Sequence, residues 1–551
     1  MAFNVADLFE HAVDAVPERT AIHCGDRQVT YRELDERANR LAHHLATRGV
    51  GQGDHVGVYS RNSIEAIEAM YAAFKLRAIP VSVNYRYVAD EVRYIAGNAD
   101  LVALIHERRY SDIVADVAPH IETLEHVIVI QDGSDLDYTR YADFEYEAAL
   151  AAQSSMRDFD ERSSDDSYIL YTGGTTGYPK GVVWRHEDIW RALGGGIQHA
   201  TGEYITDEYH YADQAKATDF VMIWLPATPM IHAAQWTAFM ALNSGGTVVL
   251  VPQFDPAAIW LAVERHGVHL LQIAGDAMAR PLLDTYLAGD HDASSLITLS
   301  SGAALFSQSL KLRYLDTFPN LIITDNIGSS ESGLTGIGQV TKGSDHSDGP
   351  RVNFSKQAVL IDDDGNLVEP EPGAVGRLAR GGPVPLGYYK DPEKSRAMFV
   401  EIDGQRYVVP GDYVRYEQDG TVTMLGRGSE CINTGGEKVF PEEVEGALKS
   451  HPDIFDTVVI GIPDDRFGWS VAAVVQPREG ATVDVAELGD HVRTKIAGYK
   501  VPRTFWILDQ IERQPSGKAN YPWAKKYAAA NPEKARKRST APSGGLPGAA
   551  G

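Results

Sequence analysis

The chain has 551 residues, of which 44% are apolar and 23% charged, a composition typical of a folded globular protein. This length exceeds what one hydrophobic core normally supports, so at least two domains are expected. The formal net charge of −25 argues against a nucleic-acid partner and against an anionic membrane surface. An anionic substrate would therefore need local positive groups.

Cysteine usage and hydropathy bear on where in the cell the protein is located. Cys24 and Cys431 lie far apart with no metal-ligand spacing around them, which argues against a disulfide framework or a zinc site. No run of residues approaches the roughly 18 apolar positions of a membrane span, and the first residues carry acids rather than a basic signal sequence. We therefore expect a cytoplasmic protein without integral membrane association.

Helical and strand patterns alternate over the first 130 residues. Thr30 and Glu33 form a capping-box pattern that opens a helix over 31–47, and a second helix is predicted over 64–76. Strands are predicted at 55–60, 79–83, 101–106 and 126–130. This alternation predicts a mostly parallel sheet covered by helices.

A glycine- and threonine-rich segment, YTGGTTGYPKG at 171–181, lies between two β-prone runs. Glycines permit positive φ angles, so successive N–H groups can form a nest, while threonine hydroxyls and Lys180 add donors and charge. The segment therefore predicts a phosphate-binding loop between two strands. It is not a Walker A loop, because the GxxxxGK[ST] pattern is absent and a strand follows it.

Beyond this loop, the acidic and tyrosine-rich segment 202–219 predicts a loop or a short excursion from a sheet. The alternation of strands and helices then resumes and predicts a second doubly wound sheet. Its strands are predicted at 247–252, 269–273, 296–300 and 321–324. From about residue 355 short strands and Asp-Gly turns predict a small antiparallel unit.

These patterns predict an α/β fold in two domains. A large N-terminal domain, 1–428, would hold doubly wound sheets and the small antiparallel unit. A compact α+β C-terminal domain would span 432–531. The basic and then Pro/Gly/Ser-rich segment 532–551 is typical of a disordered tail.

Seven strings, in order along the chain, resemble motifs of the adenylate-forming superfamily, which includes acyl-CoA synthetases, luciferases and the adenylation domains of peptide synthetases. The strings are YTGGTTGYPKG, PMIH, SGAAL, DNIGSSE, YVVPGD, NTGGEK and QPSGK. Their joint occurrence over nearly the whole chain carries the resemblance. The longer strings GDAMARPL and GRGSECINTGGEKVFPEEVE are similar to those of actinobacterial FadD-type acyl-CoA synthetases that activate steroid side chains.

The resemblance implies an ATP site. The phosphate loop would bind the β- and γ-phosphates, the SGAAL turn would bind the adenine, and Asp412 behind its glycine would accept the ribose hydroxyls. The implied nucleotide-binding residues are Thr172, Gly173, Gly174, Thr175, Thr176, Gly177, Lys180, Gly302, Ala303, Asn326, Asp412 and Arg427.

The resemblance also implies three catalytic residues, Lys518, Glu331 and Ser330. A carboxylate beside a triphosphate would be repelled unless a cation lay between them, so Glu331 would bind Mg²⁺, with Thr175 as a second ligand. Lys518 would stabilise negative charge in the adenylation step. Ser330 keeps the hydroxyl that a threonine usually supplies in the family.

Further residues would contact the acid and the thiol. The acyl pocket would contain His232, Gln235, Trp236, Ile327 and Gly328. Gly435 and Gly436 would line the tunnel for coenzyme A. The resemblance also implies a hinge at 429–431, with Glu430 as the hinge residue, about which the C-terminal domain 432–531 would move. The chain departs from the family pattern at Ile327, which replaces a tyrosine, at Pro410, which replaces a hydroxyl residue, and at Glu430, which replaces an aspartate.

The implied activity is that of an AMP-forming acid–thiol ligase. With ATP, Mg²⁺ and coenzyme A it would form an acyl-adenylate and then an acyl-CoA thioester, on a steroid side-chain carboxylate. A medium- or long-chain fatty or aryl acyl-CoA ligase, a ligase that delivers its adenylate to a carrier protein, and a catalytically dead nucleotide-binding scaffold are the competing interpretations. A homodimer is the default if subunits associate.

Overall fold

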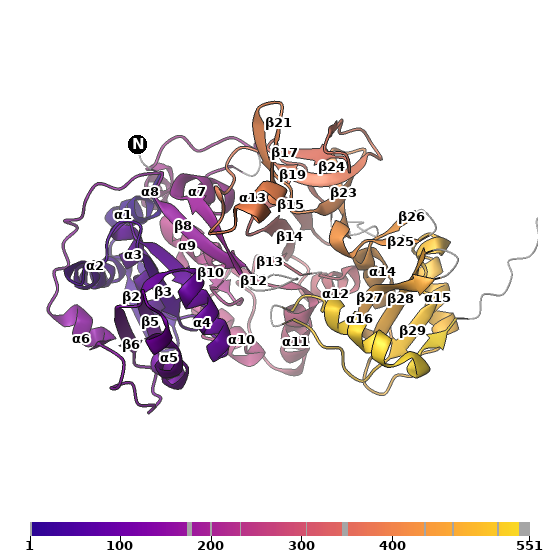
Figure 1. Cartoon of the computed structure of the whole chain (residues 1–551), viewed down its shortest axis with the longest axis horizontal. Coiled ribbons are helices and arrows are strands. Elements are labelled where there is room, and N and C mark those ends of the chain that lie inside the picture. Colours follow the sequence, from indigo (N-terminus) through magenta and orange to yellow (C-terminus); the bar gives the residue numbers. More distant parts are fainter. Residues whose placement is uncertain are drawn as a thin grey trace, which may run out of the picture.

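The computed structural model describes residues 3–172, 179–198, 201–231, 233–304, 306–343, 351–434, 437–464, 468–514 and 517–538. The chain forms a helix-covered α/β body (indigo to magenta), an antiparallel unit (orange) and a separate C-terminal α+β domain (yellow), as Figure 1 shows. This arrangement confirms the predicted fold class. Across these described residues, no helix combines the length and apolar character needed to cross a bilayer.

The first sheet has the parallel order β4-β3-β5-β6-β7. Thr30 Oγ1 accepts the N–H of Glu33, and Glu33 accepts the N–H of Thr30, so the predicted capping box opens α2. The elements are α2 (Tyr31–Thr47), β3 (His55–Tyr59), α3 (Ile64–Lys75), β4 (Ile79–Ser82), α4 (Ala89–Asn98), β5 (Leu101–Glu107), α5 (Ser111–Val117), β6 (His126–Ile130), β7 (Phe144–Glu145) and α6 (Tyr146–Ala151).

The second sheet has the order β15-β14-β13-β12-β10-β11-β1-β2. Its helices begin and end at favourable residues: Asp255 caps α10 with Pro256 in the first turn, and Gly267 ends it at φ +63°. The elements are β1 (Thr20–Cys24), β2 (Arg27–Thr30), β10 (Ile223–Pro226), α9 (Gln235–Asn243), β11 (Thr247–Leu250), α10 (Pro256–His266), β12 (Leu270–Ile273), α11 (Gly275–Ala288), β13 (Thr298–Gly302), α12 (Gln308–Thr317), β14 (Ile322–Ser329) and β15 (Gly333–Val340).

Four strands of this sheet, β1, β2, β10 and β15, were not predicted. The N-terminal hairpin β1–β2 joins it, because β1 pairs in parallel with β11, Ile22 opposite Val248. Strand β14 continues five residues beyond the predicted end at 324, because the antiparallel strand β15 pairs with it up to Ser329.

The predicted phosphate loop joins two antiparallel strands, β8 (Ser167–Thr172) and β9 (Lys180–Arg185). Thr172 lies opposite Lys180, and β20 (Gly387–Tyr388) pairs with the other edge of β9. After β9 come α7 (His186–Leu193) and the segment 202–219, which contains α8 (His210–Ala217). The segment packs back onto α1 (Val5–Ala15), because Ile205 and Tyr211 join a small hydrophobic cluster that contains Leu8 of this helix.

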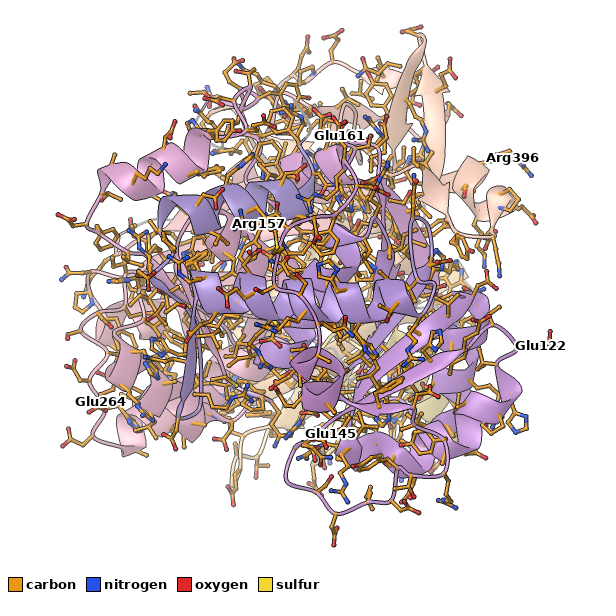
Figure 2. The ribbon with its side chains drawn as sticks, turned by 90° about the vertical axis from the view of Figure 1, so that its left-hand side faces the viewer. Glu122, Glu145, Arg157, Glu161, Glu264 and Arg396 are labelled. Atoms are coloured by element: carbon orange, nitrogen blue, oxygen red, sulfur yellow. The ribbon has the colours of Figure 1, made fainter. Side chains whose placement is uncertain are left out.

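Buried charges tie the first helices together. Lys75 Nζ is fully buried and contacts the carboxylates of Glu10 and Asp35, the latter at 2.7 Å. Arg157, labelled in Figure 2, donates to Asp35 and Asp14, each at 2.8 Å. A buried ammonium is tolerated only when carboxylates surround it, so these carboxylates are needed to keep Lys75 in the interior.

The antiparallel unit follows the second sheet and pairs as predicted from its Asp-Gly turns. Its main path is β16-β24-β23-β19-β17-β18. Strand β22 pairs with β19, and β21 pairs with β22. The elements are β16 (Arg351–Asn353), β17 (Ala358–Ile361), β18 (Leu367–Val368), β19 (Val375–Arg380), α13 (Pro392–Met398), β21 (Phe399–Ile402), β22 (Gln405–Val408), β23 (Asp412–Tyr416) and β24 (Thr421–Arg427).

The C-terminal domain is one sheet with helices on both faces. Val459, Val471 and Ala473 face a core with α14 and α15, whereas their neighbours Val458 and Ala472 face α16, as the two-residue period of a strand requires. The elements are η3 (Gly428–Glu430), β25 (Ile432–Thr434), β26 (Glu437–Val439), α14 (Pro441–Lys449), β27 (Ile454–Asp464), β28 (Gly468–Pro477), α15 (Val485–Arg493), η4 (Gly498–Lys500), β29 (Thr504–Ile507), α16 (Tyr521–Ala530), η5 (Pro532–Lys534) and β30 (Arg536–Lys537).

The predicted start of the tail at residue 532 is wrong. Strand β30 pairs antiparallel with β29, with Phe505 opposite Arg536. Trp506 Nε1 also donates to the carbonyl of Asn531 at 2.9 Å, which holds the end of α16 against the sheet. The ordered domain therefore extends at least to Arg538.

Candidate functional site

The carboxyl ends of β13 and β14 form one wall of the candidate site. Gly302 lies opposite Asn326, and a Cβ at Gly302 would lie 3.3 Å from the Asn326 carbonyl oxygen, so a side chain there would crowd the strand. Asn326 Nδ2 donates to Ser300 Oγ at 2.6 Å. Ala303 has a φ of +65°, a conformation that non-glycine residues rarely adopt and that is common at functional sites. Open α/β sheets bind ligands at this edge.

The turn after β14 holds Glu331. Ser329 Oγ accepts the N–H groups of Glu331 and Ser332 at 3.2 and 3.1 Å. The carbonyl of Ser330 accepts a hydrogen bond from Trp184 Nε1 at 3.0 Å. Because Trp184 is fully buried, the turn is fixed to the β8–β9 hairpin.

Tyr388, which the sequence analysis missed, orients the Glu331 carboxylate. Its hydroxyl donates to Glu331 Oε1 at 2.9 Å. Lys180 Nζ lies 5.4 Å from the centroid of the Tyr388 ring, within range of a cation–π contact. Burial, together with the neighbouring Lys394 ammonium, lowers the pKa of Lys180. One tyrosine thus contacts both the predicted phosphate-binding lysine and the predicted metal ligand.

The predicted ribose contacts lie opposite each other in the sheet. Asp412 begins β23 and Arg427 ends β24, and the register of these strands pairs the two residues. Gly411 precedes Asp412 with φ +92°, and its carbonyl accepts the N–H of Gly428 at 2.9 Å. Gly428 is the first residue of η3, which directly follows β24 and contains the predicted hinge. Glu430 Oε2 there pairs with Lys525 Nζ of α16 at 2.9 Å.

The loop that carries Lys518 lies against the large domain. The N–H of Gln514 donates to the Lys518 carbonyl at 3.0 Å, and Gly517 has a φ of +81°. A Cβ at Gly517 would lie 3.3 Å from Ala277 Cβ in the first turn of α11. Since α11 directly follows β12, the Lys518 loop lies at the same sheet edge as Gly302 and Asn326.

The described acyl-pocket candidates lie in separate parts of the large domain. Gln235 and Trp236 are each 1% exposed and belong to the interior, where Ser82 Oγ donates to Gln235 Oε1 at 3.0 Å and Trp236 packs edge-on against Tyr168. They line no open surface in this conformation. Ile327 packs against the core of the antiparallel unit. A Cβ at Gly328 would approach the Gly333 carbonyl oxygen to 2.1 Å, so the strand pairing itself requires this glycine.

Several predicted site residues lie outside the described residues. These are Gly173, Gly174, Thr175, Thr176, Gly177, His232, Gly435 and Gly436. The side chain of Arg427 is likewise not described.

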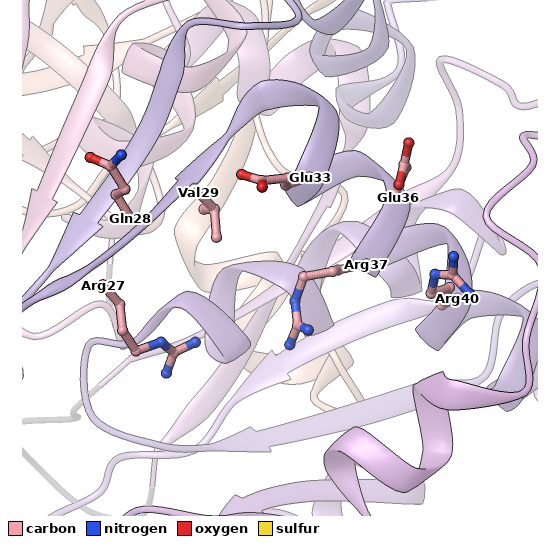
Figure 3. Close-up of a pocket in the computed structure, with 7 residues that line it drawn as sticks. All are labelled: Arg27, Gln28, Val29, Glu33, Glu36, Arg37 and Arg40. Atoms are coloured by element: carbon pink, nitrogen blue, oxygen red, sulfur yellow. The ribbon is translucent and has the colours of Figure 1, made fainter.

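A cavity away from this edge is an unsuitable ligand site. It measures about 220 Å³ and lies between β2 and α2, as the close-up in Figure 3 shows. Its three arginines already have partners: Arg27 pairs with Glu65 at 2.7 Å, Arg37 with Glu68 at 2.6 Å, and Arg40 donates to the Gln153 carbonyl. These arginines therefore stabilise the fold and are not available to bind a ligand.

Comparison with known proteins identifies the family of the chain. Residues 9–389 match the AMP-binding enzyme family, and residues 443–518 match the C-terminal domain of AMP-binding enzymes. The chain is 55% identical over 539 residues to a 3-oxocholest-4-en-26-oate–CoA ligase of Rhodococcus rhodochrous, covering 97% of each chain. It is 54% identical over 534 residues to a medium/long-chain-fatty-acid–CoA/3-oxocholest-4-en-26-oate–CoA ligase of Mycobacterium tuberculosis, again covering 97% of each.

Solved structures share the fold at low sequence identity. The anthranilate CoA ligase AuaEII in complex with anthranoyl-AMP superposes with a TM-score of 0.81 and 22% identity, covering 96% of this chain and 98% of that one. ATP-bound MatB from Rhodopseudomonas palustris gives a TM-score of 0.78 at 22% identity, with 96% and 99% covered. The family match over residues 9–389, together with the relatives that are more than 50% identical over nearly the full length, shows that the chain belongs to the AMP-binding enzyme family.

Proposed function

We propose that the protein is an ATP-dependent acyl-CoA ligase that activates a steroid side-chain carboxylic acid. The observation that carries the proposal is the position of the Lys518 loop against Ala277, at the edge formed by β12, β13 and β14. The substrate class is supported by the Rhodococcus relative, whose name specifies 3-oxocholest-4-en-26-oate.

In the first half-reaction the substrate carboxylate attacks the α-phosphorus of ATP and a new P–O bond forms. The bond from the α-phosphorus to the oxygen that bridges to the β-phosphate breaks, and pyrophosphate leaves with that oxygen. Negative charge grows on the oxygens around the reacting phosphorus, so positioned positive charge accelerates the step. Lys518 supplies such a charge from the small domain. Lys180, at the end of the phosphate loop, binds the leaving phosphates.

Mg²⁺ is part of the proposal, and Glu331 fits it. Glu331 Oε1 is oriented by Tyr388, and within the described residues its second oxygen has no hydrogen-bond partner. Mg²⁺ is usually bound by one or two carboxylates together with substrate phosphates and water, so a single carboxylate suffices. When bound, the cation would offset the charge of the phosphates. Thr175 remains the proposed second ligand, outside the described residues.

In the second half-reaction the thiol of coenzyme A loses its proton and attacks the acyl carbonyl of the adenylate. A C–S bond forms, the bond between the acyl carbon and the phosphate oxygen breaks, and AMP leaves. We assign the change from the first half-reaction to the second to a rotation of the C-terminal domain about Glu430. This domain is the one proposed from the sequence over 432–531, extended by β30 to Arg538. Rotation would withdraw Lys518 and bring Gly435 and Gly436 to the acyl-adenylate. The exposed Glu430–Lys525 pair is weak enough to break during this motion.

A carboxylic-acid panel tests the proposal. It contains steroid acids with three-, five- and eight-carbon side chains and straight-chain fatty acids, and pyrophosphate release and coenzyme A consumption are measured for each. We expect the steroid acids to be preferred and the two rates to be equal. A strong preference for unbranched fatty acids, which the name of the Mycobacterium tuberculosis relative also includes, would refute the steroid assignment.

The same panel distinguishes the carrier-protein ligase and the scaffold from an acyl-CoA ligase. Pyrophosphate release without coenzyme A consumption would indicate delivery to a carrier protein, and no exchange of pyrophosphate with any acid would indicate a scaffold. The proposal includes a cytoplasmic setting, supported by Cys24 and Cys431, neither of which forms a disulfide among the described residues. A symmetric homodimer is the default for an oligomer, and light scattering would test it.

A further inference from the structure

A chain of charged groups runs from the large domain to the Lys518 loop. Arg513, five positions before Lys518, donates to both carboxylate oxygens of Asp456, with Nε 2.7 Å from Oδ2. Its Nη1 also donates to the Gly517 carbonyl at 3.3 Å. This bidentate geometry fixes the guanidinium, and the guanidinium fixes the peptide that precedes Lys518.

Lys449, at the end of α14, continues this chain of contacts across the domain boundary. Its side chain is 2% exposed, and Nζ lies 3.2 Å from Asp456 Oδ1 and 3.7 Å from Asp276 Oδ2. Asp276 belongs to α11 of the large domain, and its Oδ1 accepts the N–H of Ser307 at 2.8 Å. The second Asp276 oxygen is buried and has no hydrogen bond among the described residues, so Lys449 is the cation that compensates it.

The positive charges of Lys449 and Arg513 stabilise the negative charge of Asp456. Burial would raise the pKa of Asp456, but Lys449 and Arg513 outweigh burial and lower this pKa to about 2. Both ends of the Asp276–Lys449 contact are largely enclosed, and separating enclosed opposite charges leaves each uncompensated. Rotation of the small domain away from α11 would break this contact, whereas Asp456 and Arg513 would stay together.

Neighbouring contacts show that α11 and α12 form one docking surface for the small domain, as their position in Figure 1 also indicates. The Arg280 guanidinium lies 5.1 Å from the centroid of the Phe455 ring. Ser309 Oγ donates to the Lys449 carbonyl at 3.5 Å. Among these contacts, the Asp276–Lys449 pair alone connects to the Lys518 loop through a series of charged groups.

We propose that Asp276 is a positioning residue for the adenylation half-reaction, which holds Lys518 in place through Lys449, Asp456 and Arg513. This inference rests on the proposed function. Asp276 belongs to the large domain and would act on the reaction only through Lys449, without contacting ATP or the acid. It would act only in the domain orientation that serves adenylation.

The test is Asp276→Asn in the full chain, assayed separately in the two half-reactions. We expect ATP–pyrophosphate exchange to fall roughly 10- to 100-fold, because a small misplacement of a catalytic group costs about that much. Formation of acyl-CoA from supplied acyl-adenylate should stay within about twofold of the unmodified protein, since the contact is broken in that orientation. The amide side chain of the variant keeps an oxygen for the Ser307 N–H, so folding should persist, and equal melting temperatures verify it.

Two further variants sharpen the result. Asp276→Glu restores the carboxylate and should recover most of the exchange rate. Asp284→Asn is the matched control on α11, because Asp284 pairs with Arg313 of the same domain at 3.4 Å and should change neither half-reaction. Unchanged exchange in Asp276→Asn, or equal loss in both half-reactions, would overturn the inference while leaving the ligase assignment intact. Absence of exchange in the unmodified protein with every acid would overturn both.

Discussion

The Tyr388 hydroxyl donates to Glu331 Oε1 at 2.9 Å, so a residue of β20 orients a carboxylate on the turn after β14. The two residues are 57 positions apart, and the same tyrosine ring lies below Lys180 Nζ. This contact links the strand that follows the phosphate loop to the proposed metal ligand. The proposed site therefore depends on Tyr388, although this side chain takes no part in the proposed chemistry.

Tyr388→Phe should weaken the response to Mg²⁺. Loss of the hydroxyl frees the Glu331 carboxylate to rotate, and removing such a supporting hydrogen bond typically lowers metal affinity roughly 10- to 100-fold. The measurement is pyrophosphate release as a function of Mg²⁺ concentration. Tyr389→Phe is the matched control, because the hydroxyl of Tyr389 instead donates to Asp100 at 2.8 Å. Equal Mg²⁺ dependence of the two variants would contradict the assigned role.

Lys518→Ala should separate the two half-reactions. Pyrophosphate release from ATP and acid should fall at least roughly 100-fold, because a positioned charge is removed from the reacting phosphoryl group. Thioester formation from supplied acyl-adenylate should persist. Lys526→Ala, on the exposed face of α16, should change neither rate. If both half-reactions fell together in Lys518→Ala, the assignment of this lysine to adenylation would be wrong.

Gly328→Ala should destabilise the large domain. The added Cβ would meet the Gly333 carbonyl oxygen at 2.1 Å, and relieving this overlap requires β14 and β15 to separate. Overpacking of this kind typically costs about 1–3 kcal/mol in the free energy of unfolding. Calorimetric melting would measure the loss. Gly97→Ala in α4, where the nearest atom lies 3.7 Å from the new Cβ, should instead be neutral or stabilising. Comparable melting temperatures for both variants would refute the steric argument.

The buried carboxyl of Glu445 should make the free energy of unfolding fall as pH rises. Burial raises its pKa from 4.5 to about 7, although Lys449 and Arg513 oppose the rise. Between these values the folded state binds more protons than the unfolded chain, so the stabilisation is complete below about pH 4.5 and lost by about pH 7. Across the whole window this amounts to about 3 kcal/mol at about 1.4 kcal/mol per pKa unit.

Glu445→Gln removes this titration, so the variant should lose less stability than the unmodified protein between about pH 5 and about pH 7.5. Denaturant unfolding at the two pH values measures the difference. Glu443→Gln, on the same helix, breaks an ion pair with Lys500 and should lower stability by similar amounts at both pH values. Parallel pH profiles for Glu445→Gln and the unmodified protein would show that the carboxyl does not titrate in this window.

Local patterns predicted the local structure well. The Thr30–Glu33 capping box and the hairpin around the phosphate loop depend on residues close in sequence, and both are present. The β1–β11 pairing, the Tyr388–Glu331 contact and the Asp276–Lys449 contact join distant segments, and a single sequence contains no periodic pattern for them. Trp236 is apolar enough for either a pocket or a core, so only packing could place it in the interior.

The far edge of the second sheet has a consequence for synthesis of the chain. Thr247 Oγ1 donates to the Thr20 carbonyl across 227 positions, and β1 has no parallel partner until β11 exists. At roughly 5–20 residues per second, the ribosome needs roughly 10–45 s to make the intervening chain. During that interval β1 exposes an unpaired edge, so the nascent chain should bind holdase chaperones most strongly before residue 250 has emerged.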